Sequence, residues 1–106
     1  MVLNTNQFHD DAFWQYRVGQ GLSKGTTDDK LNSLKYFQRA IEMADSLKKL
    51  FLHQASFNHA AANVLADIND KSAKDYYIRA IEKCQNSKYK IQIEKDLNKF
   101  LSRDAY

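Results

Sequence analysis

Apolar residues recur at every third or fourth position along most of this chain, the spacing that places them on one face of an α-helix. Similar spacing predicts helices over residues 7–23, 31–45, 47–68, 72–84 and 87–103. No segment predicts a strand, so the pattern indicates an all-α fold of five helices. The clearest stripe, in the second of these segments, consists of Leu31, Leu34, Phe37, Ala40, Ile41 and Ala44.

Turn-forming residues mark the ends of these helices. The chain has no proline, and its three glycines all lie within residues 19–25, which favours long helices over a fold with many turns. One clear loop spans residues 23–30, and residues 69–70 and 86–87 end two later helices. The residues expected to cap helix N-termini, by accepting backbone hydrogen bonds, are Thr27 or Asp28, Ser46 and Ser72.

Length and composition indicate one globular domain. The chain has 106 residues, of which 43% are hydrophobic and 27% are charged, an ordinary balance for a folded protein. The N-terminal sequence lacks the pattern of a secretory signal, and no apolar stretch approaches the roughly 18 residues that span a bilayer. The single cysteine, Cys84, cannot form an internal disulfide, which fits a reducing compartment. We therefore expect a cytoplasmic protein without a membrane partner.

The charged residues are interleaved along the whole chain. The formal net charge is +3, and both halves of the sequence carry nearly balanced numbers of basic and acidic residues. Such interleaving is typical of solvated helix faces, whereas phosphate binding needs concentrated positive charge. We therefore do not expect a nucleic-acid partner.

The sequence contains an internal repeat. YFQRAIEMAD (residues 36–45) and YYIRAIEKCQ (residues 76–85) share tyrosine, arginine, alanine, isoleucine and glutamate at matched positions, 40 residues apart. Self-similarity at a period of this size is typical of stacked helical hairpins.

Residues 57–80 resemble one repeat of the tetratricopeptide repeat (TPR) family. Small residues on both helices let the two backbones approach closely, while Phe57 and Tyr77 fill the space between hairpins. The residues that carry the resemblance are Phe57, Ala60, Ala61 and Val64, then Ala73, Tyr77 and Ala80. In a less regular first copy, with about two residues inserted in the loop, they are Val18, Gly19, Leu22, Ser33, Phe37 and Ala40.

The resemblance covers about residues 13–85. It implies hairpins at about 7–45 and 46–85, followed by a capping helix at about 87–103. The sequence departs from the family in its alanine at position 60, its valine at position 64, its lack of a closing proline and its long period. A generic helical bundle is the alternative interpretation.

No arrangement of catalytic or metal-binding residues stands out. His53 and His59 are six positions apart and point to different helix faces, unlike the i, i+4 pair of a zinc helix. Residues 9–11 (His-Asp-Asp) fit a helix terminus better than a metal site, and Cys84 fits a small core residue. The glycines of residues 19–25 lack the lysine of a phosphate loop. We expect no enzymatic activity, metal or cofactor.

In stacked hairpins of the TPR family, the first helices line a concave groove that receives a partner peptide. The resemblance therefore implies a groove formed by residues 13–24 and 55–66, and work as an adaptor or small chaperone. The family's two-carboxylate clamp is not matched, because Tyr16 and Gln20 stand at the positions of its lysine and asparagine. A peptide with an acidic group would suit the expected lining: Phe13, Tyr16, Arg17, Gln20, Lys24, Asn58, His59, Ala62 and Leu65.

Two hairpins are close to the minimum for a stable stack, because each hairpin leaves an apolar face open. At the N-terminal end of the stack, little covers the aromatic residues Phe8, Phe13 and Trp14. Their exposure predicts self-association through the first helix or a partner that hides them. A structural subunit of a homo-oligomer or larger complex, with no free groove, is the alternative function. The last helix is expected to close its end of the stack with Tyr89, Ile93, Leu97 and Phe100.

Overall fold

The described backbone consists of five α-helices joined by short connections. The computed structural model describes the backbone of residues 5–47 and 51–104, and the side chains of residues 12–44 and 53–103. Within these ranges there is no strand, which confirms the all-α prediction. The helices are α1 (Thr5–Leu22), α2 (Thr27–Leu47), α3 (Phe51–Asp67), α4 (Ala73–Lys83) and α5 (Ser87–Asp104).

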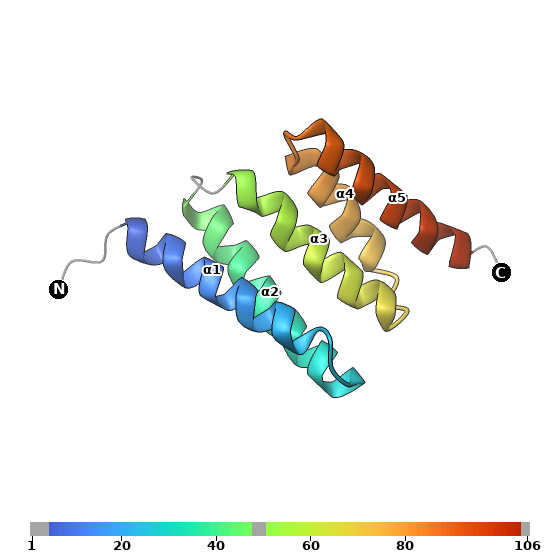
Figure 1. Cartoon of the computed structure of the whole chain (residues 1–106), viewed down its shortest axis with the longest axis horizontal. Helices are drawn as coiled ribbons and strands as arrows, with labels where there is room; N and C mark the ends of the chain where they lie inside the picture. Colours follow the sequence, from blue (N-terminus) through green and yellow to red (C-terminus); the bar gives the residue numbers. More distant parts are fainter. Residues whose placement is uncertain (1–4, 48–50, 105–106) are drawn as a thin grey trace.

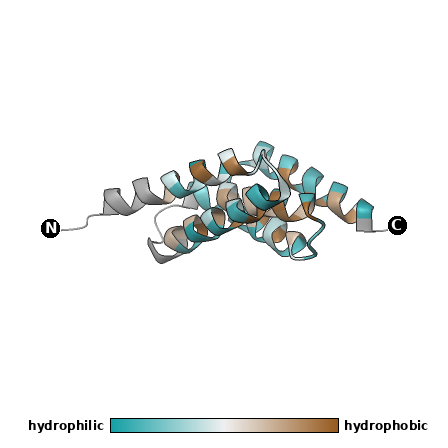
Figure 2. Cartoon of the chain, turned by 90° about the horizontal axis from the view of Figure 1, so that it is seen from below, coloured by the Kyte–Doolittle hydropathy of each residue, from teal (hydrophilic) through white to brown (hydrophobic). Residues whose placement is uncertain are grey.

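The helices alternate in direction and form two antiparallel hairpins followed by a single helix (Figure 1). Helix α1 packs against α2, α3 packs against α4, and the two hairpins meet mainly through α2 and α3. The last helix, α5, packs against α4 and touches α3 to a lesser extent. The molecule measures 54 × 32 × 18 Å, and Figure 2 shows this flattened shape from the edge.

The 40-residue repeat relates equivalent positions of α2 and α4. The first residues of the two matched segments, Tyr36 and Tyr76, are both half-buried. Because the equivalent positions around them are buried in both hairpins, the sequence repeat is also a structural repeat. The buried pairs are Ser33 and Ala73, Phe37 and Tyr77, and Ala40 and Ala80.

Small residues bring α1 and α2 close together. Ala12, Ala40 and Ala44 are fully buried, and Gly19 lies directly against the buried ring of Phe37. A Cβ atom at Gly19 would lie only 2.7 Å from Cε1 of Phe37. This distance is too short for a carbon–carbon contact, so the packing of the first hairpin requires glycine at this position.

Helix α2 begins with a reciprocal pair of hydrogen bonds. The backbone N–H of Asp29 donates to Oγ1 of Thr26 at 3.2 Å, and the backbone N–H of Thr26 donates to Oδ2 of Asp29 at 3.1 Å. This arrangement satisfies two N–H groups that the helix leaves without partners. The predicted caps, Thr27 and Asp28, are wrong by one or two positions, since both lie inside α2.

The other helix ends agree with the sequence in part. The predicted cap Ser46 is wrong, because α2 continues to Leu47. Ser72 is the N-cap residue of α4, as predicted, but its hydroxyl makes no cap bond and donates instead to Oδ1 of Asp70 at 2.6 Å. Asn69 ends α3 in the left-handed conformation, at φ 59°, which asparagine tolerates better than most residues. Among the described residues, no helix is both long enough and apolar enough to cross a bilayer.

Candidate functional site

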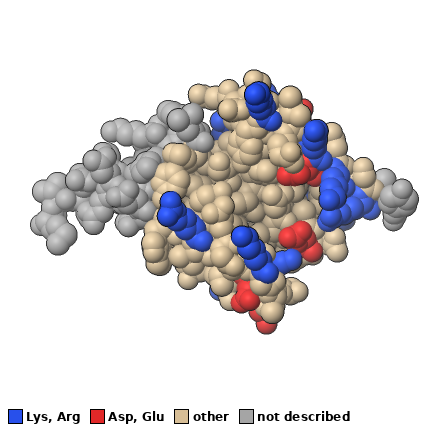
Figure 3. Space-filling model, in the orientation of Figure 1, with Lys and Arg blue, Asp and Glu red and all other residues tan. Residues whose placement is uncertain are grey.

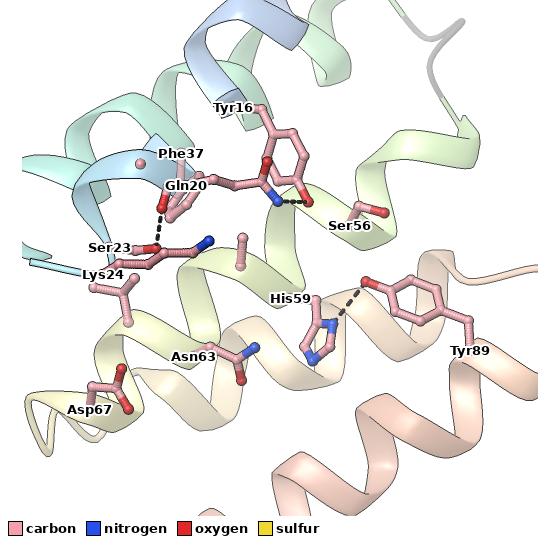
Figure 4. A pocket seen from close by; sticks show the side chains of 13 residues that line it. Tyr16, Gln20, Ser23, Lys24, Phe37, Ser56, His59, Asn63, Asp67 and Tyr89 are labelled. Atoms are coloured by element: carbon pink, nitrogen blue, oxygen red, sulfur yellow. Dashed lines mark hydrogen bonds between the residues drawn. The ribbon is translucent and has the colours of Figure 1, made fainter. Parts of the chain in front are cut away.

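A groove runs across the face formed by α1, α3 and α5. Its first part is a hollow of about 350 Å³ between α1 and α3, with Tyr89 of α5 at its far side (Figure 4). The lining is mainly polar, with aromatic rings only at its edges. The polar and aromatic lining residues are Tyr16, Gln20, Ser23, Lys24, Phe37, Ser56, His59, Asn63, Asp67 and Tyr89.

A second hollow of about 290 Å³ continues the groove between α3 and α5. Asn63 and Asp67 line both hollows, so the two form one continuous surface along α3. The second hollow adds charged side chains from α5, namely Asp96, Lys99 and Arg103.

His59 connects α3 to α5 within the groove. Its Nε2 lies 2.6 Å from Oδ2 of Asp96, and its Nδ1 lies 2.8 Å from Oη of Tyr89. The His59 side chain is only 12% exposed. Helix α5 touches α3 much less than it touches α4, and these two polar contacts link it to α3 within the groove.

Two further tyrosines place their hydroxyl groups at the groove. Tyr16 packs its ring on Phe57, with ring centroids 5.0 Å apart, and accepts a hydrogen bond from Nε2 of Gln20 at 2.9 Å. Tyr77 donates from Oη to Oδ1 of Asn63 at 2.6 Å. With its oxygen so engaged, Asn63 presents an amide NH₂ group that has no hydrogen-bond partner among the described residues and can donate to a ligand.

The groove phenols stay protonated over the physiological pH range. Burial raises the pKa of Tyr89 to about 12, and burial together with the nearby carboxylates of Asp96 and Asp67 raises the pKa of Tyr77 to about 12. Burial also raises the pKa of Tyr16. Each phenol therefore retains its hydroxyl proton and can donate a hydrogen bond at neutral pH.

The charges along the groove that lack partners are positive. Asp67 lies 3.5 Å from Nζ of Lys30, and Asp96 is held by His59 and by Nε2 of Gln92 at 3.1 Å. Figure 3 shows basic side chains spread over this face of the molecule, with acidic ones beside them. In contrast to the two carboxylates, three cations of the groove make no ion pair with any described residue: Lys24, Lys99 and Arg103.

The structure places only part of the expected lining in this groove. Tyr16, Gln20, Lys24 and His59 line the first hollow, as expected. Arg17 is exposed and lies outside both hollows.

Three expected lining residues are instead part of the core. Asn58, Ala62 and Leu65 are each at most 4% exposed, so the prediction that they face the groove is wrong. Helix α3 has neighbours on most sides, and apolar residues therefore occur all around it. The sequence reasoning missed Ser56, Asn63, Asp67 and Tyr89, although the first three form a polar stripe with His59 at helical spacing.

The aromatic residues expected at a self-association surface differ in their exposure. Trp14 is 59% exposed, as such a surface would require. Phe13 is half-buried, with its ring 4.3 Å from that of His53 and 5.9 Å from that of Phe57. The side chain of Phe8 lies outside the described residues.

Neither histidine nor cysteine forms part of a metal site in the described ranges, where no group of three suitable ligands converges. Cys84 is half-buried, and its Sγ donates to the backbone oxygen of Asn86 at 3.2 Å. Comparison with known proteins finds no match to this chain among family models, curated proteins or solved structures.

Proposed function

We propose that this chain is a non-enzymatic, TPR-like interaction module that holds a partner peptide in the groove of α1, α3 and α5. The observation that supports this most directly is the continuous polar groove across three helices, because it offers hydrogen-bond donors and positive charges that no described residue of the chain uses. A peptide brings the complementary groups, since every residue supplies a backbone carbonyl acceptor.

The chemistry of the groove favours an extended peptide with acidic side chains. At the centre, Asn63 has an amide NH₂ group that no described residue engages, and it can donate to a peptide carbonyl. Lys24 stands at one end of the groove and Lys99 and Arg103 stand at the other, where they can pair with carboxylates. The ring of Tyr16 and the side chain of Ala60, both half-buried, supply a small apolar surface for an anchor residue.

The proposal assigns no catalytic step to this site. The series Asp96, His59, Tyr89 has the order of a catalytic triad, but it ends in a phenol whose pKa is raised to about 12. Such a group remains protonated and is a poor nucleophile at neutral pH. We therefore favour an adaptor or small chaperone, and we place it in the cytoplasm because its single cysteine fits a reducing compartment.

A structural subunit is the second candidate because the outer side of the first hairpin is open. Trp14 is 59% exposed, and Leu22 and Tyr36 line a hollow on the outer side of the first hairpin. In the second hairpin, Tyr76 is the equivalent of Tyr36, and it faces the first hairpin, where its Oη accepts from Nε2 of Gln38 at 3.5 Å. The outer hollow is thus a place where a further hairpin could stack.

Peptide selection from a displayed library, followed by calorimetry on the selected peptides, tests the proposal. We expect Asn63→Ala and Lys24→Glu each to weaken binding by about tenfold, the effect of losing one hydrogen bond to a charged or polar ligand group. Arg79→Glu is the matched control, because Arg79 is exposed on α4 and outside both hollows. Selected peptides that bind both groove variants as tightly as the unmodified chain would contradict the proposal.

A further inference from the structure

The direction of the hydrogen bonds at His59 follows from the groups around it. Asp96 offers a carboxylate, which only accepts, so Nε2 of His59 carries a proton. A neutral imidazole has only one N–H group, and Nδ1 is then an acceptor. The hydroxyl of Tyr89 must therefore donate its proton to Nδ1, at 2.8 Å.

Tyr89 has no second proton to offer while His59 is neutral. The phenol carries a single proton, and the bond to Nδ1 of His59 uses it. Both Tyr89 and Ser56 line the first hollow of the groove. In this state the phenol presents no donor to a ligand lying there.

Protonation of His59 reverses the bond to Tyr89. A charged imidazole donates from both ring nitrogens, so Nδ1–H donates to Oη and Nε2–H continues to donate to Asp96. The Tyr89 oxygen then accepts from His59, and its own proton is released from that bond. Because Tyr89 lines the first hollow, the phenol can then donate to a ligand in the groove.

We propose that His59 and Tyr89 form a proton-controlled specificity element, which favours a carboxylate in the groove when His59 is charged and does not when His59 is neutral. This inference rests on the proposed function, because it concerns the same groove. It adds a ligand class, the carboxylate, and a dependence on pH that the shape of the groove alone does not imply.

The other groups that face this element agree with a carboxylate ligand. From α5, Asp96 compensates the charge of His59, while Lys99 and Arg103 add positive charge farther along the groove. From α4, the uncharged ring of Tyr77 lies 6.1 Å from the imidazole. Across the hollow stand the uncharged Tyr16 and the cation Lys24, and on α3 itself the carboxylate of Asp67 is paired with Lys30.

A matched pair of small probes tests the inference on the full chain. Acetate and acetamide have the same shape, but only acetate carries a carboxylate. NMR first follows the His59 ring through its own titration, and chemical-shift changes then give the affinity for each probe on either side of the midpoint. We expect the affinity for acetate at the groove to rise about tenfold when His59 becomes charged, as for a charge-assisted hydrogen bond, while the affinity for acetamide stays constant.

Two variants separate the effect of the Tyr89 hydroxyl on acetate binding from the effect of the positive charge on His59. Tyr89→Phe removes the hydroxyl but keeps the ring, and we expect most of the pH-dependent gain in acetate affinity to disappear. His53→Gln changes the other histidine of α3, whose ring packs on Phe13 away from the groove, and should leave the gain unchanged. A gain that survives Tyr89→Phe, or an acetate affinity that stays constant through the titration of His59, overturns the inference.

These measurements and the peptide selection fail independently. If the selected peptides bind the groove with no dependence on His59, the proposed specificity element is contradicted and the proposed function is not. A pH-dependent acetate site, with no selected peptide sensitive to Asn63→Ala, would do the reverse.

Discussion

Replacing Gly19 with alanine tests the close packing of α1 on α2. In an exposed helix interior this change stabilises a protein by about 0.5–1 kcal/mol, because alanine loses less backbone entropy on folding. At Gly19, however, the new Cβ would lie 2.7, 2.9 and 3.1 Å from three ring atoms of Phe37. That ring is only 1% exposed and is packed in the hydrophobic core, so overpacking of about 1–3 kcal/mol opposes the gain.

Gly21 provides the matched control, since it lies in the same helix and a Cβ there would meet none of the described residues within 4 Å. Both variants gain the same helix propensity, and their difference isolates the contact with Phe37. Urea unfolding followed by circular dichroism should show Gly19→Ala to be about 1–3 kcal/mol less stable than Gly21→Ala. The difference should shrink when Phe37→Leu is added, because the shorter side chain leaves room. Equal stability of the two alanine variants would refute the packing described for this hairpin.

Three other residue changes have defined outcomes. Thr26→Ala removes one side of the reciprocal bonds that start α2 and should lower the free energy of unfolding by about 1 kcal/mol in urea. Asn69→Ala, at φ 59°, should cost about 1 kcal/mol in the same assay, whereas glycine should be neutral or better. The pKa values of Tyr77 and Tyr89 are raised from 10.0 to about 12, so the folded chain holds these protons more tightly. That contribution to the free energy of unfolding is complete below pH 10 and is lost as the pH rises toward 12. Tyr89→Phe removes one of the two ionising phenols, so the chain should unfold at a higher pH in an alkaline titration followed by circular dichroism.

The sequence was most informative where a helix has one clear apolar face. In α2 the stripe from Leu34 to Ala44 packs into the core as predicted, but its first predicted member, Leu31, is 47% exposed. The repeat placed Tyr36 and Tyr76 in equivalent positions of the two hairpins. Periodicity works there because one side of such a helix faces solvent. The helix starts were less accurate, since several neighbouring residues near Thr26 have side chains that can act as a cap.

Helix α3 shows why the groove was harder to predict. It packs against α2, α4 and α5, so apolar residues occur on most of its sides and their spacing does not identify the remaining open side. The buried polar Asn58 adds to the ambiguity, because its Oδ1 is enclosed without a hydrogen-bond partner among the described residues. Tyr89 and Asp96 could not be assigned to the groove from sequence, because their contact with His59 depends on how α5 packs, 30 or more positions away.

The central claim is that the face of α1, α3 and α5 holds a protein partner, and site-specific photo-cross-linking tests it most directly. A benzoyl-phenylalanine placed at Gln20, in the groove, is compared with one placed at Arg79, on the exposed face of α4. In extracts of the native cell we predict that one partner cross-links from Gln20 and not from Arg79, and that the Asn63→Ala change weakens this product. Cross-linking of the same partner from Arg79 alone, or no product that depends on the groove, would contradict the account.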